Sequence, residues 1–279
     1  MEKLREEMEK NLEIKGYSPK TKKVYLKEAE KFAEFYNKRP DKMGRTEIKD
    51  YLHHLITGKK CSSSILHQAY SAIKFLYVTV MEREWEFTSI PRMKKEKRLP
   101  IVLDTNEVSA ILKATNNIKH KALLTIIYSA GLRVSEAARL KITDIDSKRM
   151  QIRVEQAKGA KDRYTLLSGV ALDILRKYWS TYHPSFWLFN GQAGCTHITE
   201  RTIQKVFENC RNKAGITKPV SVHSLRHSFA THLLENGIGI HHIQLLLGHS
   251  SPKTTTVYLH VTRKDLAKIT SPLDTLTNL

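Results

Sequence analysis

A chain of 279 residues is long enough for one large or two modest domains, each with its own hydrophobic core. Its 47 lysines and arginines outnumber its 28 aspartates and glutamates, and both halves of the chain are basic, which favours a polyanion as the partner. Three scattered cysteines, a charged N-terminus and the lack of a long apolar run exclude a disulfide framework, a secretory signal and a transmembrane helix, and predict a soluble, cytoplasmic protein.

The first third of the chain predicts a small helical domain. Residues 1–15 form a charged lead of helical composition, and further helices are expected over residues 18–37, 46–57 and 62–80. The first of these three begins with a serine followed by proline, which is a typical helix start. The helical spacing of the aromatic residues places them in a core rather than on a base-stacking surface.

A basic segment without periodicity follows this helical domain. Residues 91–100 begin and end with proline and contain a dense run of lysines and arginines. This composition predicts a linker between a first domain over residues 1–90 and a second over residues 101–279. The linker is expected to act as a tether, and its lysines could also follow a phosphate backbone.

The second domain combines helices with a short hairpin. Asp104 and Glu107 have the spacing of a capping box, and a strongly apolar helix is expected over residues 119–130. Alternating apolar residues over 149–155 predict a strand, and residues 164–167 form the return strand after a turn. Further helices are expected over residues 170–182 and 198–214, with a loop between them.

The stretch from His223 to Tyr258 organises the whole chain. It predicts three helical pieces, of which the first two end at glycines and the third opens with serine-proline. His223 and Arg226 are three residues apart, so one helical face can carry both. His249 directly follows the second glycine stop. Short rigid elements therefore present an arginine, two histidines and a tyrosine.

These residue types suit the chemistry of a phosphodiester. An arginine can neutralise the non-bridging oxygens as a pentacovalent transition state forms, because its planar fork matches phosphate. A tyrosine hydroxyl can attack phosphorus and hold it covalently, and histidines can bind phosphate or move protons near neutral pH. A second arginine and a general acid are still needed, and both have candidates upstream.

At these motifs the chain resembles the tyrosine recombinases of the phage-integrase family. HSLRHSFATHLL, LLLGHSS and TTTVYLHV match the family's signature strings in order, and AGLRVSE matches its first arginine box. Lys158 lies at the position of the family's β-hairpin lysine. The resemblance extends from about Thr105 to about Val261, and more weakly over the N-terminal part. Leu259 replaces the threonine often seen after the tyrosine, which alters no role.

The resemblance implies a mainly α fold with two parts. Residues 1–90 would form a helical core-binding (SAM-like) domain. Residues 101–279 would form a helix-rich α+β catalytic domain with a small antiparallel β-sheet. The two domains would close around duplex DNA as a clamp.

The resemblance also implies which residues bind the scissile phosphate and attack it. Tyr258 would be the nucleophile, forming a 3′-phosphotyrosyl link and releasing a 5′-hydroxyl. Arg133 and Arg226 would clamp the phosphate. Arg139 competes for the role of Arg133, although its place deeper in the next helix favours a structural role.

Proton transfer is assigned in the same way. Lys158 would be the general acid for the leaving oxygen, and Lys161 in the same turn is its competitor. His223 and His249 would contact the phosphate or assist proton transfer. Glu136 would orient His223 and help to hold the first arginine box.

No cofactor is expected, because a covalent intermediate conserves the energy of the broken bond without metal or ATP. A metal site remains an alternative reading of the many histidines, but HSLRH lacks the glutamate of HExxH and the cysteines are dispersed. The phosphate-binding P-loop string is also absent. His227 and His232 are therefore expected to support helix packing.

The predicted function is site-specific recombination of double-stranded DNA, similar to that of simple Xer-type, integron or plasmid-borne recombinases of mobile genetic elements. Four protomers would act on two DNA sites, and the free chain would be a monomer or weak dimer in a bacterial cytoplasm, with no membrane partner. Three alternatives remain: a type IB topoisomerase that relaxes DNA, a catalytically silent DNA-binding protein, and a metal-dependent nuclease.

Overall fold

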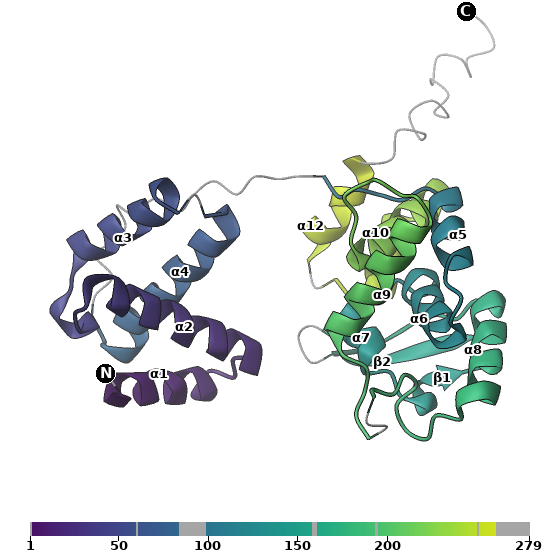
Figure 1. Ribbon diagram of the computed structural model, residues 1–279, viewed down its shortest axis with the longest axis horizontal. Coiled ribbons are helices and arrows are strands. Elements are labelled where there is room, and N and C mark those ends of the chain that lie inside the picture. Colours follow the sequence, from purple (N-terminus) through teal and green to yellow (C-terminus); the bar gives the residue numbers. More distant parts are fainter. Residues whose placement is uncertain are drawn as a thin grey trace, which may run out of the picture. The chain divides into compact units, whose positions relative to one another are not determined.

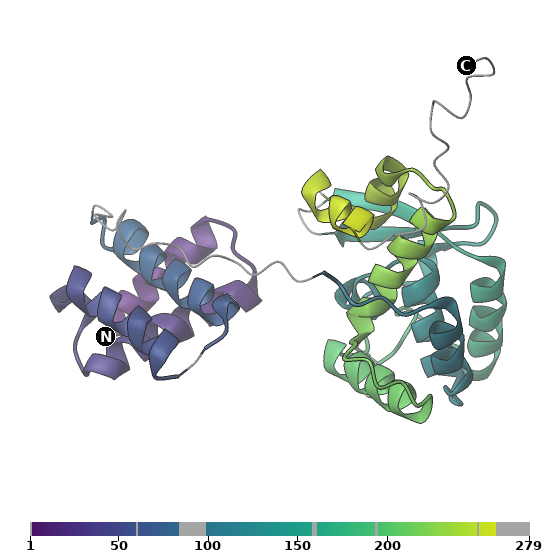
Figure 2. The same ribbon diagram turned by 90° about the horizontal axis from the view of Figure 1, so that it is seen from above.

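A computed structural model describes most of the chain. The described residues are 2–59, 61–83, 99–157, 161–192, 195–249 and 251–260. The chain divides into two compact units, Met1–Arg98 and Leu99–Leu279, and each is described by itself (Figures 1 and 2). Most of the predicted linker, residues 91–100, lies outside the described residues.

The described part of the N-terminal unit is helical throughout (Figure 1). Its elements are α1 (Glu2–Ile14), α2 (Pro19–Tyr36), η1 (Pro40–Lys42), α3 (Arg45–Thr57), α4 (Ser63–Phe75) and the π-helical turn η2 (Leu76–Val80). The Ser18 hydroxyl accepts a hydrogen bond from the Thr21 backbone N–H at 3.2 Å, which fixes the start of α2 as predicted. Asn37 ends that helix in the left-handed conformation, with a φ of 47°.

Aromatic side chains fill the core of this unit. Phe32, Tyr51 and Tyr77 are each at most 2% exposed, and the ring of Phe32 meets the other two edge-on. The Tyr77 hydroxyl donates to the Pro40 carbonyl at 2.8 Å, so its buried polar atom is satisfied. The predicted aromatic core is confirmed for these residues, whereas Phe35 is 43% exposed.

The C-terminal unit combines helices with one small sheet. Its elements are α5 (Thr105–Lys113), α6 (Ile118–Ser129), α7 (Val134–Ala138), η4 (Ile142–Asp144), β1 (Ile145–Asp146), β2 (Gln151–Ala157), β3 (Lys161–Leu166), α8 (Gly169–Tyr182), α9 (Glu200–Lys213), α10 (Val222–Glu235), α11 (Ile240–Leu247), α12 (Pro252–Thr255) and η5 (Thr256–His260). The strands pair antiparallel in the order β1-β2-β3. The predicted fold class, mainly α with a small antiparallel sheet, is confirmed.

Helix α6 forms the centre of this unit. It is apolar around most of its circumference and packs against both α8 and α10. The expected capping box opens α5, since the Asp104 carboxylate accepts from the Glu107 N–H and the Glu107 carboxylate accepts from the Asp104 N–H. No described helix combines the length and apolarity needed to cross a bilayer.

The observed elements differ from the predicted ones in one added strand and in several bounds. Strand β2 covers Gln151–Ala157 rather than 149–155, and β3 covers Lys161–Leu166 rather than 164–167, because Ala157 pairs with Lys161 next to the turn. The two-residue strand β1 was not expected, because it exists only through its pairing with β2. Helix α9 begins at Glu200 rather than at Ile198, because the Thr199 hydroxyl accepts from the Thr202 N–H at 3.1 Å and acts as the N-cap. Ile198 instead lies in the core, 3% exposed.

The C-terminal helices place Tyr258 against a small apolar core of its own. Helices α10 and α11 have the predicted glycine-terminated form, and Tyr258 follows on the 3-10 turn η5. The tyrosine packs in one cluster with buried side chains from α10 and α11. The members of this cluster are Phe229, Ala230, Leu234, Ile243, Leu247 and Tyr258.

Candidate active site

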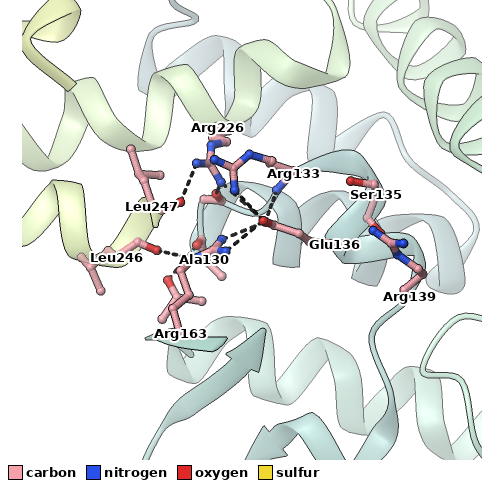
Figure 3. Close-up of polar contacts among 11 residues, drawn as sticks. Ala130, Arg133, Ser135, Glu136, Arg139, Arg163, Arg226, Leu246 and Leu247 are labelled. Carbon is pink, nitrogen blue, oxygen red and sulfur yellow. Dashed lines mark hydrogen bonds and ion pairs between the residues drawn. The ribbon is translucent and has the colours of Figure 1, made fainter. Parts of the chain in front are cut away.

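One carboxylate, Glu136, lies at the centre of three arginines (Figure 3). Its oxygens accept from the backbone N–H and from Nη1 of Arg133, the N-cap of α7, both at 2.7 Å. Arg163 binds both carboxylate oxygens, at 2.9 and 2.8 Å, and Nη1 of Arg226 lies 3.6 Å from Oε2. Because one negative charge faces three positive charges, the cluster retains an excess of positive charge and favours an anion nearby.

Glu136 is held ionised by these contacts. Burial raises its pKa, but the hydrogen bonds and charge of Arg163, the backbone N–H of Arg133 and the charge of Arg226 outweigh burial and lower the pKa to about 2. The carboxylate is therefore a fixed counter-ion at neutral pH.

Arg226 is the most deeply buried of the three guanidinium groups, at 1% exposure. Its Nη1 donates to the Gly131 carbonyl and its Nη2 to the Leu247 carbonyl, both at 2.7 Å. Burial, with the charge of Arg133, lowers its pKa to about 9, which leaves it protonated near pH 7. Arg226 thus connects α10 by hydrogen bonds to the ends of α6 and α11.

Arg163 enters the cluster from strand β3. Besides its paired contacts with Glu136, its Nε donates to the Leu246 carbonyl at 2.9 Å. It therefore connects the hairpin, α7 and the end of α11. The next turn requires glycine, because Gly248 has a φ of 62° and a Cβ there would lie 2.6 Å from Cδ of Arg163.

Gly131 has an equivalent position at the end of α6. Its φ is 61°, and a Cβ at this position would lie 2.4 Å from Cδ1 of Phe229. Only glycine lets the chain pass this close to α10 while its carbonyl accepts the bond from Arg226.

The accessible side of the cluster is formed by Arg133 and His223. The Arg133 side chain is 22% exposed, His223 is exposed, and both line an open pocket of about 640 Å³ beside α9. Arg139, the predicted competitor of Arg133, does not join the cluster (Figure 3). It is exposed and its Nε donates to the Ser135 carbonyl at 3.1 Å.

Tyr258 is 2% exposed, and the rings of two histidines lie near its own ring. Its hydroxyl forms a hydrogen bond of 3.1 Å with Nδ1 of His227. The ring of His249 is nearly parallel to the phenol ring, at 15° and 6.4 Å between centroids. Nδ1 of His249 is in turn bonded to the Thr255 hydroxyl at 2.8 Å, which fixes the imidazole.

Burial controls the protonation of these side chains. It lowers the pKa of His227 to about 4 and that of His249 to about 3, and the nearby Arg226 acts in the same direction on both. Burial also raises the pKa of Tyr258, although Arg226 and Arg133 oppose this. At neutral pH the two histidines are therefore uncharged and the phenol keeps its proton.

His223 lies one turn before His227 on α10, and the two rings meet edge-on at 4.8 Å. The hydrogen bonds described for Glu136 go to Arg133 and Arg163. The expectation that Glu136 orients His223 therefore stays a prediction.

The predicted general acid, Lys158, lies outside the described residues. Lys161 is the first residue of β3, and its side chain is likewise outside the description. The choice between the two lysines stays a prediction.

Two residues of the site, Arg163 and His227, have contacts that the sequence did not predict. No role is predicted for Arg163 in the hairpin. An arginine at an inward position of an alternating strand nevertheless indicates a buried polar contact. His227 was expected only to support packing, although it lies four residues after His223 and so shares its face. Within the described ranges, no group of three His, Cys, Asp or Glu side chains is arranged to hold a metal ion.

Comparison with known proteins covers both units. The family described as "Phage integrase family" matches residues 102–265, and "Phage integrase, N-terminal SAM-like domain" matches residues 4–87. A provisionally named integrase/recombinase of Sinorhizobium fredii is 41% identical to this chain, over 98% of the chain and 89% of the relative. The tyrosine recombinase XerC of Lactobacillus delbrueckii is 30% identical to this chain, and the match covers 90% of this chain and 92% of XerC.

Solved structures share the fold. The crystal structure of the XerH site-specific recombinase bound to its palindromic difH substrate, a post-cleavage complex, has a TM-score of 0.73 and 22% identity. It covers 91% of this chain and 79% of XerH.

Proposed function

We propose that this chain, which belongs to the phage integrase family, is a site-specific recombinase that cuts and rejoins duplex DNA through a covalent bond to Tyr258. Family membership makes it a DNA strand-transferring enzyme of the tyrosine recombinase type. The observation that carries the proposal is the excess positive charge around Glu136, formed by Arg133, Arg163 and Arg226.

Binding of the scissile phosphate would fall to Arg133 and Arg226. Arg133 is the more accessible of the two, and Arg226 supplies buried charge from behind it. A charge held in a water-excluded site acts strongly on a transition state and needs no rearrangement during the reaction. Glu136 would keep both guanidinium groups in place through its contacts with them.

Cleavage follows as one substitution at phosphorus. The Tyr258 hydroxyl loses its proton to a base and its oxygen forms a bond to phosphorus, while the bond to the 5′ oxygen breaks and Lys158 gives that oxygen a proton. The product is a 3′-phosphotyrosyl link and a free 5′-hydroxyl. Because the link conserves the energy of the broken bond, a 5′-hydroxyl from the other site can reverse the step without metal or ATP.

The two remaining predicted residues have places in this scheme. His223, exposed beside Arg133, would contact the phosphate. His249 would hold the phenol ring in line by stacking on it, since its own imidazole is fixed by Thr255.

The DNA partner is supported by charge and by a relative. The chain carries a formal net charge of +19, as expected for a protein that neutralises phosphates. XerH, which shares the fold, was crystallised bound to its DNA substrate. Strand exchange would take place in a tetramer on two such sites, and the free chain would be a monomer or weak dimer.

Covalent trapping tests the proposal. The protein is incubated in EDTA with a selected DNA site that has a nick beside the cleavage position, so that the cut strand diffuses away and ligation cannot reverse. Wild type should form a protein–DNA adduct, and Tyr258→Phe should bind the same DNA without forming one. Binding without an adduct from either protein would favour the silent DNA-binding alternative, and cleavage only with added metal would favour a nuclease.

A second assay separates a recombinase from a type IB topoisomerase, because both form the same adduct. Two labelled sites on separate DNA molecules should exchange strands in a reaction that needs both sites. Relaxation of a supercoiled plasmid without exchange between sites would contradict the recombinase.

A further inference from the structure

We propose that His227 is the base that removes the proton from Tyr258 as this tyrosine attacks DNA. The role rests on the proposed function, in which Tyr258 is the nucleophile. Sequence reasoning gave His227 only a packing role, whereas the structure places its ring nitrogen on the oxygen that would react.

The geometry favours His227 over the other histidines of the site. Its Nδ1 lies 3.1 Å from the Tyr258 hydroxyl, within the distance at which a base can take a proton directly. The corresponding nitrogen of His249 is bonded to Thr255, and its ring lies nearly parallel to the phenol ring with the centroids 6.4 Å apart. His223 contacts the ring of His227, and no hydrogen bond to Tyr258 is described for it.

Both partners of this hydrogen bond are held by secondary structure. His227 lies in the middle of α10, one turn after His223. The phenol of Tyr258 is packed into the apolar cluster of α10 and α11. The contact is therefore fixed before DNA arrives, as expected of a preorganised base.

The charge state of the pair suits the transfer. A base must be neutral, and burial together with the charges of His223 and Arg226 lowers the pKa of His227 to about 4. These two lie on α10 with it, Tyr258 faces it from η5, and His249, which follows α11, also interacts with it electrostatically. The phenol needs a base, because burial raises its pKa above the ordinary value.

The proton and bonds balance in both directions. During cleavage the Tyr258 O–H bond breaks, its proton moves to Nδ1 of His227, and the phenolic oxygen bonds to phosphorus. The bond from phosphorus to the 5′ oxygen breaks at the same time, and Lys158 gives that oxygen a proton. The protonated imidazole then lies beside the new ester oxygen. During rejoining, a 5′-hydroxyl gives its proton to Lys158 and its oxygen bonds to phosphorus. The bond from phosphorus to the phenolic oxygen breaks, and His227 returns the proton to that oxygen.

The test is the pH dependence of adduct formation on nicked DNA under single-turnover conditions, from pH 6 to 9. Wild type should give a flat profile, because His227 is already neutral and the phenol still protonated throughout. His227→Ala should be slower by about 10²-fold or more at pH 7. Its rate should rise about tenfold per pH unit, since only the ionised phenol then attacks.

Two further variants separate chemistry from packing. His227→Asn keeps a group that can hydrogen-bond to the phenol but accept no proton at these pH values, so it should fold normally and still be slow. His232→Ala is the matched control on the same helix, since it loses a 2.9 Å hydrogen bond to Tyr128 and should keep the flat profile.

Replacement of Tyr258 by 3,5-difluorotyrosine gives a direct readout of the base. Fluorine lowers the pKa of the phenol, so this replacement should restore much of the rate lost in His227→Ala and change the rate of the histidine-containing protein little. A purely structural role of His227 would give no such rescue.

The outcomes distinguish this role from the proposed function. An adduct from wild type, with His227→Ala equally fast and flat in pH, would contradict the role of His227 alone. A faster His227→Ala would contradict it too, because the bond would then hold the tyrosine in a resting position. No adduct from wild type on DNA that it binds would contradict the proposed function and, with it, the base.

Discussion

The two sides of the site present opposite electrostatic arrangements. On one side, three buried or half-buried arginines share one counter-ion, because Glu136 binds all of them. On the other side, Tyr258 lies near His227 and His249, and burial keeps both imidazoles uncharged. The same loss of water is compensated by ion pairing on the first side and by loss of charge on the second.

This difference matches what each side has to do. A phosphate clamp needs permanent positive charge, so its cations must survive burial through a shared counter-ion. A nucleophile needs a partner that is free to take a proton, so the group beside it must be neutral at working pH. The fold achieves both within one unit, because the start of α7, strand β3 and helix α10 bring the arginines to Glu136, while the tyrosine packs against α10 and α11.

Removing the shared counter-ion should have the largest effect. Glu136→Gln leaves the arginine cluster without its negative charge, and breaking a buried ion pair costs about 3–5 kcal/mol. Calorimetry should show the transition of the C-terminal unit lowered by roughly 10 °C. Glu208→Gln is the control, because its pair with Lys205 is exposed and should contribute less than about 1 kcal/mol. Equal losses from both variants would contradict the role of Glu136.

The two sides should lose stability in different ranges of pH. His227 and His249 have folded-state pKa values below the ordinary 6.5, so their protonation favours the unfolded chain. The contribution of the two neutral histidines to the free energy of unfolding is complete above about pH 6.5. It should fall by up to about 3 kcal/mol per histidine as the pH drops toward 4. Glu136 has a lowered pKa, so its contribution should be lost only as the pH falls from 4.5 toward 2.

Urea unfolding at pH 7, 5.5 and 4.5 measures the first of these ranges. The double variant His227→Asn and His249→Asn should flatten the dependence between pH 6.5 and 4.5, because neither replacement titrates there. An unchanged slope in the double variant would contradict the assignment of this range to the two histidines.

Two glycine substitutions should have smaller effects and should separate the energetic cost of a contact with Arg163 from the cost of the left-handed backbone. Gly248 and Gly237 both have positive φ, but only at Gly248 would a Cβ meet Arg163. Changing either glycine to alanine should cost about 1 kcal/mol for the left-handed conformation. Gly248→Ala should cost about 1 kcal/mol more, because Arg163 must move. Chemical denaturation measures both, and equal losses would show that the approach to Arg163 has no energetic weight.

Local signals in the sequence predicted much of the fold. The serine-proline start of α2, the capping box of α5 and the glycine stop of α11 depend on neighbours within a few residues, so they could be identified without a structure. Strand β1 could not, because two residues become a strand only by pairing with β2.

The same distinction applies to the site. The motifs named Arg133, Arg226 and Tyr258 because each occurs in a recognisable string. Arg163 binds Glu136 across 27 residues of sequence, and His227 binds Tyr258 across 31. Periodicity assigns such residues to a face but not to a partner, so their roles become visible only once the elements pack.

Covalent attachment of the DNA to Tyr258 can be tested directly by locating the residue that is bonded to the DNA 3′-phosphate. The trapped adduct would be digested with nuclease and trypsin, and the tryptic peptide spanning residues 254–263 examined by tandem mass spectrometry. We expect a nucleotide 3′-phosphate on Tyr258 in this peptide and none in Tyr258→Phe. Attachment to any other residue, or an adduct that persists in Tyr258→Phe, would contradict it.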